Sequence, residues 1–261
     1  MDFFNRKQHS LYAEQCPVAE LAKQYGTPLY IYSRATIERH WHAFDQAAGE
    51  RPHLVCYAVK ANSNIAVLNV LAKLGAGFDI VSVGELERVL KAGGSPDKMV
   101  FSGVAKTADE MRRALAVGVH CFNVESAAEL ERLNEVAVEM GVKAPVSLRV
   151  NPDVDAQTHA KISTGKSENK FGIELNRVHE VCKKAADMPG IRIVGLAMHI
   201  GSQLTETGPF REAYTRMYGL ATKLRADGFN VEQLDLGGGL GIPTNVRGMP
   251  RIAGVRVYYE F

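Results

Sequence analysis

Polar residues stand at the ends of several apolar runs, where buried strands are expected to finish. Lys60 follows such a run, His199 lies at the end of another, and Gly237, Gly238 and Gly239 end a third. A neutral lysine amine attacks carbonyl groups, and the bare N–H groups of a glycine run at a helix start bind phosphate. The types and places of these residues therefore predict covalent chemistry at Lys60 beside a phosphate cradle.

Each of these residues also has an ordinary structural explanation. A strand-end lysine is often a solvated charge, a lone histidine is often a satisfied core residue, and a glycine run often makes a tight turn. Convergence on one rim favours a site, to which the Ser202 hydroxyl adds a donor. Two other glycine patterns are dismissed: 237–241 lacks dinucleotide-fingerprint spacing, and GVAKT (103–107) lacks the phosphate-loop glycine before its lysine.

Alternating strand-like and helix-like segments must position these residues. Seven strands are expected, namely HLVCYAV (53–59), GFDIVS (77–82), KMVFSG (98–103), HCFNVE (120–125), APVSLRVN (144–151), IVGLAMHIG (193–201) and EQLDLGGG (232–239). Helices are expected over 83–93, 107–118 and 126–141, the last opened by a capping-box pattern, SAAE. The alternation predicts an α/β fold with a parallel sheet, a (β/α)8 TIM-type barrel with an open doubly wound sheet as the alternative.

Composition excludes several other classes of protein. The chain has 261 residues, of which 46% are hydrophobic and 23% charged, and its net charge of +2 predicts neither a nucleic-acid nor a membrane partner. The first fifteen residues lack the apolar core of a signal peptide. The four cysteines are far apart and form no metal-type pairs, so no metal is expected. Free thiols in a reducing cytoplasm are the simplest expectation.

Together, the rim residues match the needs of pyridoxal 5'-phosphate. Its aldehyde condenses with a lysine amine, its phosphate needs fixed donors, and its ring needs a face to stack on. The end of an apolar strand is expected to disfavour the ammonium form of Lys60 and so to favour attack.

Longer motifs carry a family resemblance. The stretches are YAVKAN (57–62), FDIVSVGEL (78–86), HIGSQ (199–203), DLGGGLGIP (235–243) and, most discriminating, RVNPDVDAQTHAKISTGKSENKFGI (149–173). Over about residues 8–243 the chain resembles the diaminopimelate decarboxylase family of barrel-type (fold type III) pyridoxal-phosphate enzymes. The 149–173 stretch is similar to the diaminopimelate branch rather than to the ornithine or arginine enzymes.

The resemblance implies an activity and a role for each site residue. Members release carbon dioxide from meso-diaminopimelate to give L-lysine, and they are homodimers that act on this small amino acid in the cytoplasm. By resemblance, Lys60 forms the Schiff base, His199 stacks on the pyridine ring, and Ser202 with the three glycines holds the phosphate. Asp79 lies near the Schiff base and Arg149 near the ring hydroxyl. His159 and His179 have no counterpart and are expected to be ordinary surface or loop histidines. An amino-acid racemase on the same fold and a non-catalytic pyridoxal-phosphate barrel remain alternatives.

The end of the chain departs from the family. Members exceed 400 residues, with a C-terminal β-domain and an eighth-strand motif whose glutamate pairs with the pyridine nitrogen. We therefore expect an N-terminal segment (1–30), a cofactor-binding barrel (31–243) and an atypical tail (244–261) in which the β-domain is missing. A frameshift or an interrupted gene is the hypothesis for this departure. Sequencing the locus downstream for the remaining domain in another reading frame tests it.

The tail itself alternates as a strand does, with Val255, Val257 and Tyr259 at every second position, so a strand is expected here. Occupation of the eighth strand position and a coincidental pattern are the two alternatives for it. Without the glutamate, cofactor capture is expected to survive and decarboxylation to be slow or absent.

Overall fold

The structure, a computed structural model, describes residues 3–154 and 171–241 and the backbone of 255–260. His159, most of the family-specific stretch 149–173 and most of the tail lie outside the described residues. No helix in the described part of the chain is long and apolar enough to cross a membrane.

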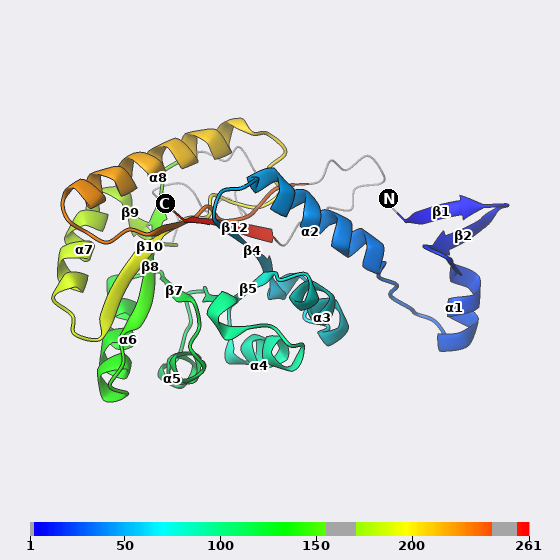
Figure 1. The fold of residues 1–261 in the computed structure, drawn as a ribbon, viewed down its shortest axis with the longest axis horizontal. Coiled ribbons are helices and arrows are strands. Elements are labelled where there is room, and N and C mark those ends of the chain that lie inside the picture. The colour runs from blue at the N-terminus through cyan, green and yellow to red at the C-terminus, as the bar shows by residue number, and fades with distance from the viewer. Residues whose placement is uncertain (1–2, 155–170, 242–254, 261) are drawn as a thin grey trace.

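The seven expected strands are all present and form a curled parallel sheet, which confirms the predicted fold class (Figure 1). Several are shorter than the sequence pattern indicated. They are β4 (His53–Ala58), β5 (Gly77–Ile80), β6 (Met99–Phe101), β7 (Cys121–Val124), β8 (Ala144–Asn151), β10 (Ile191–Ala197) and β11 (Gln233–Asp235). A short strand, β9 (Ile173–Glu174), adds to the end of β8, and β8 also pairs directly with β10.

The tail closes the barrel. Strand β12 (Val255–Glu260) lies between β11 and β4 and pairs with both, so the sheet returns to its first strand. Both pairings are antiparallel, with Val257 opposite Val55 of β4 and Tyr259 opposite Leu234 of β11. The expected strand is therefore confirmed in the eighth position. Its direction is opposite to that of the other barrel strands, so its amino end lies at the rim where they end.

Side chains alternate between the two faces of each strand, as the pleat requires. On β5 and β6 the large residues Phe78, Ile80 and Phe101 are fully buried in the layer between strands and helices. The opposite face carries smaller groups, and Val100 belongs to a separate small cluster inside the barrel. Buried polar side chains such as Asp79 share that inner face. Apolar packing on the outside of the sheet thus leaves the narrow interior for polar residues.

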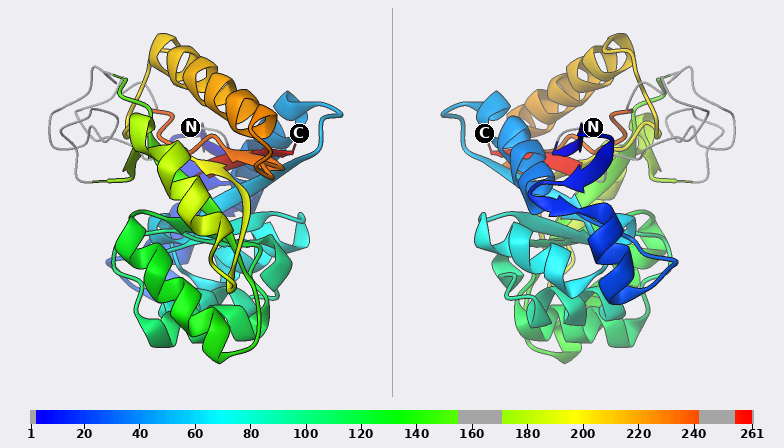
Figure 2. Two further views of the ribbon diagram at one scale, coloured as in Figure 1. Left: turned by 90° about the vertical axis from the view of Figure 1, so that its left-hand side faces the viewer. Right: turned by 90° about the vertical axis from the view of Figure 1, so that its right-hand side faces the viewer.

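Helices surround the barrel strands on the outside (Figures 1 and 2). They are α2 (Arg34–Ala48), α3 (Ile65–Lys73), α4 (Val83–Lys91), α5 (Ala108–Val117), α6 (Ala127–Glu139), α7 (Val178–Ala186) and α8 (Gly208–Ala226). Several begin at a side-chain cap that follows a strand, such as Ser82 before α4. A cap that satisfies a first-turn amide fixes where the strand ends and the helix begins.

The predicted capping box at the start of α6 forms only in its forward half. Ser126 Oγ accepts a hydrogen bond from the amide of Glu129, but the Glu129 carboxylate accepts instead from the amide of Glu125. The reciprocal capping box is found at α5, where Thr107 and Glu110 bond each other's backbone amides. The GVAKT segment thus ends in a helix cap.

The N-terminal segment forms its own small antiparallel sheet beside the barrel (Figure 1). It comprises β1 (Phe4–Lys7), β2 (Ser10–Ala13) and β3 (Cys16–Pro17), followed by α1 (Val18–Tyr25), none of whose residues is buried. Glu14 connects this unit to the barrel because its carboxylate accepts from the Ser33 hydroxyl and from the amide of Ala35, at the start of α2. These hydrogen bonds lower the pKa of Glu14.

A proline in β12 tests the closure. We expect Val257→Pro to remove a donor from the ladder and to speed amide hydrogen exchange in β4 and β11 by about fivefold or more, since each lost hydrogen bond costs about 1 kcal/mol. Amides of β7 and β8 in the same sample serve as the internal control. Equal exchange at β4 in both proteins contradicts the pairing with β12.

Candidate active site

The predicted site residues gather at the carboxyl end of the barrel. Lys60 lies in a single 3-10 turn (Val59–Ala61) directly after β4. Lys60 is an exposed residue, which gives no support to the expectation that the end of an apolar strand disfavours its ammonium form. Strand β4 ends at Ala58, and Val59, the first residue of the turn, is still buried. Lys60 is the first exposed residue after the strand.

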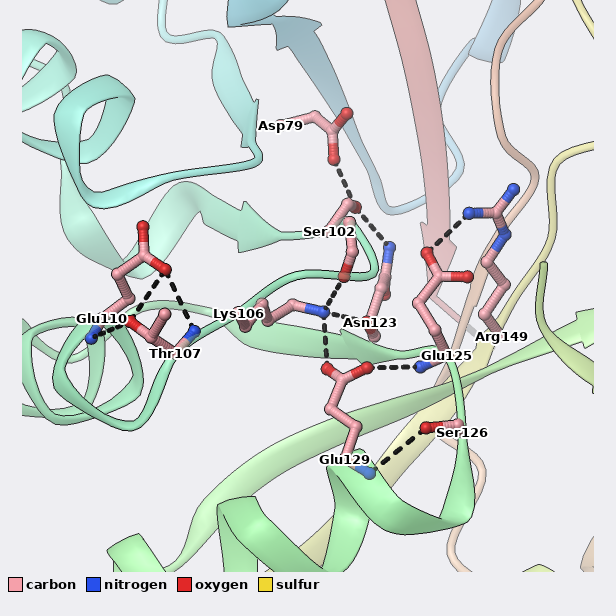
Figure 3. A network of polar contacts seen from close by, with 11 residues as sticks. Asp79, Ser102, Lys106, Thr107, Glu110, Asn123, Glu125, Ser126, Glu129 and Arg149 are labelled. Carbon is pink, nitrogen blue, oxygen red and sulfur yellow. Dashed lines mark hydrogen bonds and ion pairs between the residues drawn. The ribbon is translucent and has the colours of Figure 1, made fainter. Parts of the chain in front are cut away.

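A chain of hydrogen bonds crosses the barrel interior below this rim (Figure 3). The Ser102 hydroxyl donates to Asp79 Oδ1 at 2.5 Å, and Asn123 Nδ2 lies 3.1 Å from Ser102 Oγ. The same Asn123 amide nitrogen donates to Asp235 Oδ2 at 2.7 Å. Asn123 and Asp235 belong to β7 and β11, which are not neighbours, so this bond spans the interior. It joins opposite walls of the barrel.

Asp235 also connects the interior to the glycine run. Its second carboxylate oxygen accepts from the amide of Gly237 at 2.8 Å. The next amide, that of Gly238, donates to Nδ1 of His199 at 3.4 Å. His199 is half-buried, two residues beyond the end of β10. The run therefore lies directly beside the predicted ring-stacking histidine, and the Asp235 carboxylate fixes its start.

Close backbone contact explains why these positions are glycines. Gly237 and Gly239 have φ values of 72° and 100°, in the region that side chains rarely adopt. A Cβ on Gly237 would overlap the carbonyl oxygen of Met198, and one on Gly239 would overlap that of Gly201. The loops after β10 and β11 are thus packed backbone to backbone. Ser202 lies half-buried in the first of these loops.

Arg149 occupies the other side of the rim. It is buried on β8, and its Nη1 lies 2.6 Å from Oε1 of Glu125, which follows β7 directly. The guanidinium carbon also lies 5.4 Å from the ring centroid of Phe171. The second oxygen of Glu125 is buried and has no hydrogen-bond partner among the described residues. An orphaned carboxylate oxygen at a rim is available to a polar group of a ligand.

The charges of Lys60 and Asp79 both act on the carboxylate of Glu85. Burial raises the pKa of Glu85, the Asp79 charge raises it further, and the amide of Val81 and the positive charge of Lys60 lower it. Glu85 lies in the first turn of α4, directly behind β5. Lys60 and Asp79 therefore each lie close enough to Glu85 to affect its pKa.

The structure places each predicted site residue on a barrel strand or in the segment that follows one, and it brings His199 against Gly238. Next to several of them lie groups to which the sequence assigned no role. Those groups are Ser102, Asn123, Glu125 and Asp235. Their signal in the sequence was a polar residue at alternate positions of an apolar strand, which marks the inner face of a barrel. The described residues contain no group of three or more metal-binding side chains.

Two predictions about residues outside the site agree with the structure. His179, expected to be an ordinary surface histidine, pairs with Asp227 at 3.0 Å on the outside of the barrel. All four cysteines are free, and burial raises the pKa of Cys121 and of Cys182 to about 12, so both stay protonated thiols.

Comparison with known proteins defines the class. Residues 34–251 match the family described as pyridoxal-dependent decarboxylase, pyridoxal binding domain. The chain belongs to this family, which confirms the predicted resemblance and the cofactor that it implies.

Individual relatives carry a more specific name. The chain is 61% identical over 243 residues to the diaminopimelate decarboxylase of Vibrio cholerae and 62% identical over 242 residues to that of Haemophilus influenzae, in each case over 93% of this chain. Among solved structures, the diaminopimelate decarboxylase of M. jannaschii in complex with L-lysine has a TM-score of 0.87 at 37% identity, over 96% of this chain and 60% of that one. The chain spans 58% of the length of the two bacterial relatives.

Alanine at Gly239 tests the packing of the glycine run. We expect Gly239→Ala to lower the free energy of unfolding by about 2–4 kcal/mol, because the new Cβ meets a backbone oxygen at an unfavourable φ. Gly219→Ala in α8 is the control, since nothing lies within 4 Å of its Cβ, and it is expected to stabilise by up to about 1 kcal/mol. Equal urea midpoints for the two variants contradict the packing.

Titration of Glu85 tests the place of Lys60. We expect Lys60→Met to raise the pKa of Glu85 further, since burial and the Asp79 charge then act with less opposition. A raised carboxyl pKa stabilises the folded chain fully below the ordinary value of 4.5, and this contribution is lost as the pH rises through the folded pKa. Carboxyl carbon NMR measures the shift, and Lys91→Met, at the exposed end of α4, is the control. A Glu85 pKa that stays unchanged places Lys60 elsewhere.

Proposed function

We propose that the chain is the cofactor-binding part of an enzyme that decarboxylates meso-diaminopimelate to L-lysine with pyridoxal 5'-phosphate. The observation that carries the proposal is identity of about 60% to proteins named diaminopimelate decarboxylase, over nearly the whole chain. The rim supports it, because each residue type that the family motif supplies lies at a strand end. A racemase or a non-catalytic barrel has no comparable support.

The residues present fit the cofactor. A phosphate needs backbone that approaches closely, and Gly237 and Gly239 lie where any Cβ would overlap the chain. An aldehyde needs an accessible amine, and Lys60 is exposed at the rim. The polar atoms of the ring need hydrogen-bond partners. Glu125 offers a buried carboxylate oxygen that has no hydrogen-bond partner among the described residues.

Each residue then has a proposed task. Lys60 holds the cofactor covalently through Nζ, while Ser202 and the glycine run bind the phosphate. His199, whose Nδ1 accepts from the run itself, presents its ring as a stacking face. When bound, the cofactor supplies an electron sink for the carbanion that decarboxylation leaves. Asp79 stays near Lys60 Nζ, where its charge stabilises a protonated nitrogen.

Arg149 is proposed to bind an anionic or hydroxyl oxygen at the rim. Its guanidinium is held from one side by Glu125 and from the other by Phe171, so its direction is fixed before any ligand arrives. A planar donor that is already oriented loses less entropy when a ligand binds. The proposal also includes assembly as a homodimer in the cytoplasm, which the resemblance implies. Gel filtration of the chain tests the dimer.

Covalent trapping tests the role of Lys60. Purified chain is mixed with pyridoxal phosphate, reduced with borohydride, digested and analysed by mass spectrometry. We expect the pyridoxyl label on the peptide that carries Lys60 and its loss to background in Lys60→Met, because this amine combines access with the proposed phosphate cradle. Lys91→Met, an exposed lysine of α4, is expected to keep the label.

The same samples test the reaction when meso-diaminopimelate is added and both lysine and carbon dioxide are measured. Label spread evenly over exposed lysines overturns the assigned site. Label on Lys60 with inversion of the amino acid but no carbon dioxide overturns the decarboxylase proposal in favour of a racemase.

A further inference from the structure

The side chain of Lys106, in the GVAKT segment, is completely buried. It is 0% exposed, and its ammonium donates three hydrogen bonds. The acceptors are the carbonyl oxygens of Gly103 at 2.6 Å and Asn123 at 2.8 Å, and Oε1 of Glu129 at 2.6 Å (Figure 3). All three protons of the ammonium are therefore used within the chain. This lysine is a structural partner of β7 and α6.

The Lys106–Glu129 pair binds two backbone groups at the end of β7, one carbonyl and one amide. Lys106 holds the carbonyl of Asn123, and the second oxygen of Glu129 accepts from the amide of Glu125 at 3.0 Å. Glu129 is itself fixed at the start of α6, where its amide donates to Ser126 Oγ. The backbone that leads from Asn123 to Glu125 is thus set by one buried ion pair.

The side chains of Asn123 and Glu125, whose backbone this pair holds, contact residues of the candidate site. Asn123 donates across the barrel to Asp235, which fixes the start of the glycine run. Glu125 orients Arg149 at a separation of 2.6 Å. A shift at the end of β7 therefore moves both the phosphate side and the arginine side of the rim.

Stability alone is a weak reason for such a pair. Burial removes the hydration of both charges, and apolar residues of similar volume are often equally stable in their place. Burial also raises the pKa of Glu129, with the Lys106 charge acting against it. What an apolar pair cannot do is hold one backbone carbonyl and one backbone amide at fixed positions.

We propose that Lys106 and Glu129 are positioning residues that set the place of Asn123 and Glu125, and through them the glycine run and Arg149. The inference rests on the proposed function for its effect on cofactor binding. Its effect on Arg149 is independent of that function.

Two variants separate positioning from stability. Lys106→Met leaves the Glu129 charge buried without its cation, and we expect the melting temperature to fall by about 5–15 °C. Lys106→Met/Glu129→Leu removes both charges and is expected to recover part of that loss. The matched control is Lys184→Met/Glu131→Leu, which removes an exposed pair that also involves α6.

The first readout is the affinity for pyridoxal phosphate, from Lys60 labelling against cofactor concentration. We expect it to fall about tenfold or more in both Lys106 variants, since groups misplaced by about 1 Å lose effects of that size. The second readout is modification of Arg149 by phenylglyoxal without cofactor, relative to Arg112. The Arg149 side chain is 9% exposed and that of Arg112 43%, so release from Glu125 is expected to raise the ratio several-fold.

The outcomes decide between the two roles. Recovery of melting temperature without recovery of either readout supports positioning. Recovery of both readouts together with stability overturns it, because the pair is then only structural. If the double variant does not fold, Glu129→Gln takes its place, and its melting temperature and the same two readouts are compared with those of Lys106→Met. If the original chain takes no Lys60 label, the proposed function fails, and the Arg149 ratio still decides the positioning role.

Discussion

The hydrogen bond between Asn123 and Asp235 depends on one constraint, the narrow interior of a closed small barrel. Large apolar side chains face the helices, so inner positions of β5, β7 and β11, and Ser102 directly after β6, hold polar groups. Buried polar groups must bond one another, because water cannot reach them and an unmade bond costs about 1–3 kcal/mol. The resulting network fixes the strand ends and the glycine run at the same time.

The strand that closes the barrel runs in the opposite direction to the other barrel strands. Strand β12 completes the sheet between β11 and β4, which removes two exposed edges that would otherwise pair with other chains. Because it runs antiparallel, its carboxyl end lies away from the rim that the other strands build. The backbone of β12 pairs with both of its neighbours, and the parallel strands bring their carboxyl ends to the rim.

Much of the fold and part of the site were predictable from local sequence. The seven parallel strands, Lys60 at the end of the first of them, and the glycine run follow from apolar runs and residue types that need no knowledge of contacts. The exposure of Lys60 was not predictable, because it depends on where β4 ends and the 3-10 turn begins. The capping box was assigned to Ser126 and formed at Thr107 instead, since the Glu129 carboxylate was already taken by Lys106 and Glu125.

The sequence by itself determined the strands, their order along the chain and the chemical groups that end them, because these depend on periodicity and residue type within short windows. The tertiary structure alone decided which groups meet. Asn123 and Asp235 are 112 residues apart, and Lys106 and Glu129 are joined only because β6 and β7 are neighbours. The direction of β12 was equally undecided, since an alternating pattern fits either direction and only its neighbours β4 and β11 select one.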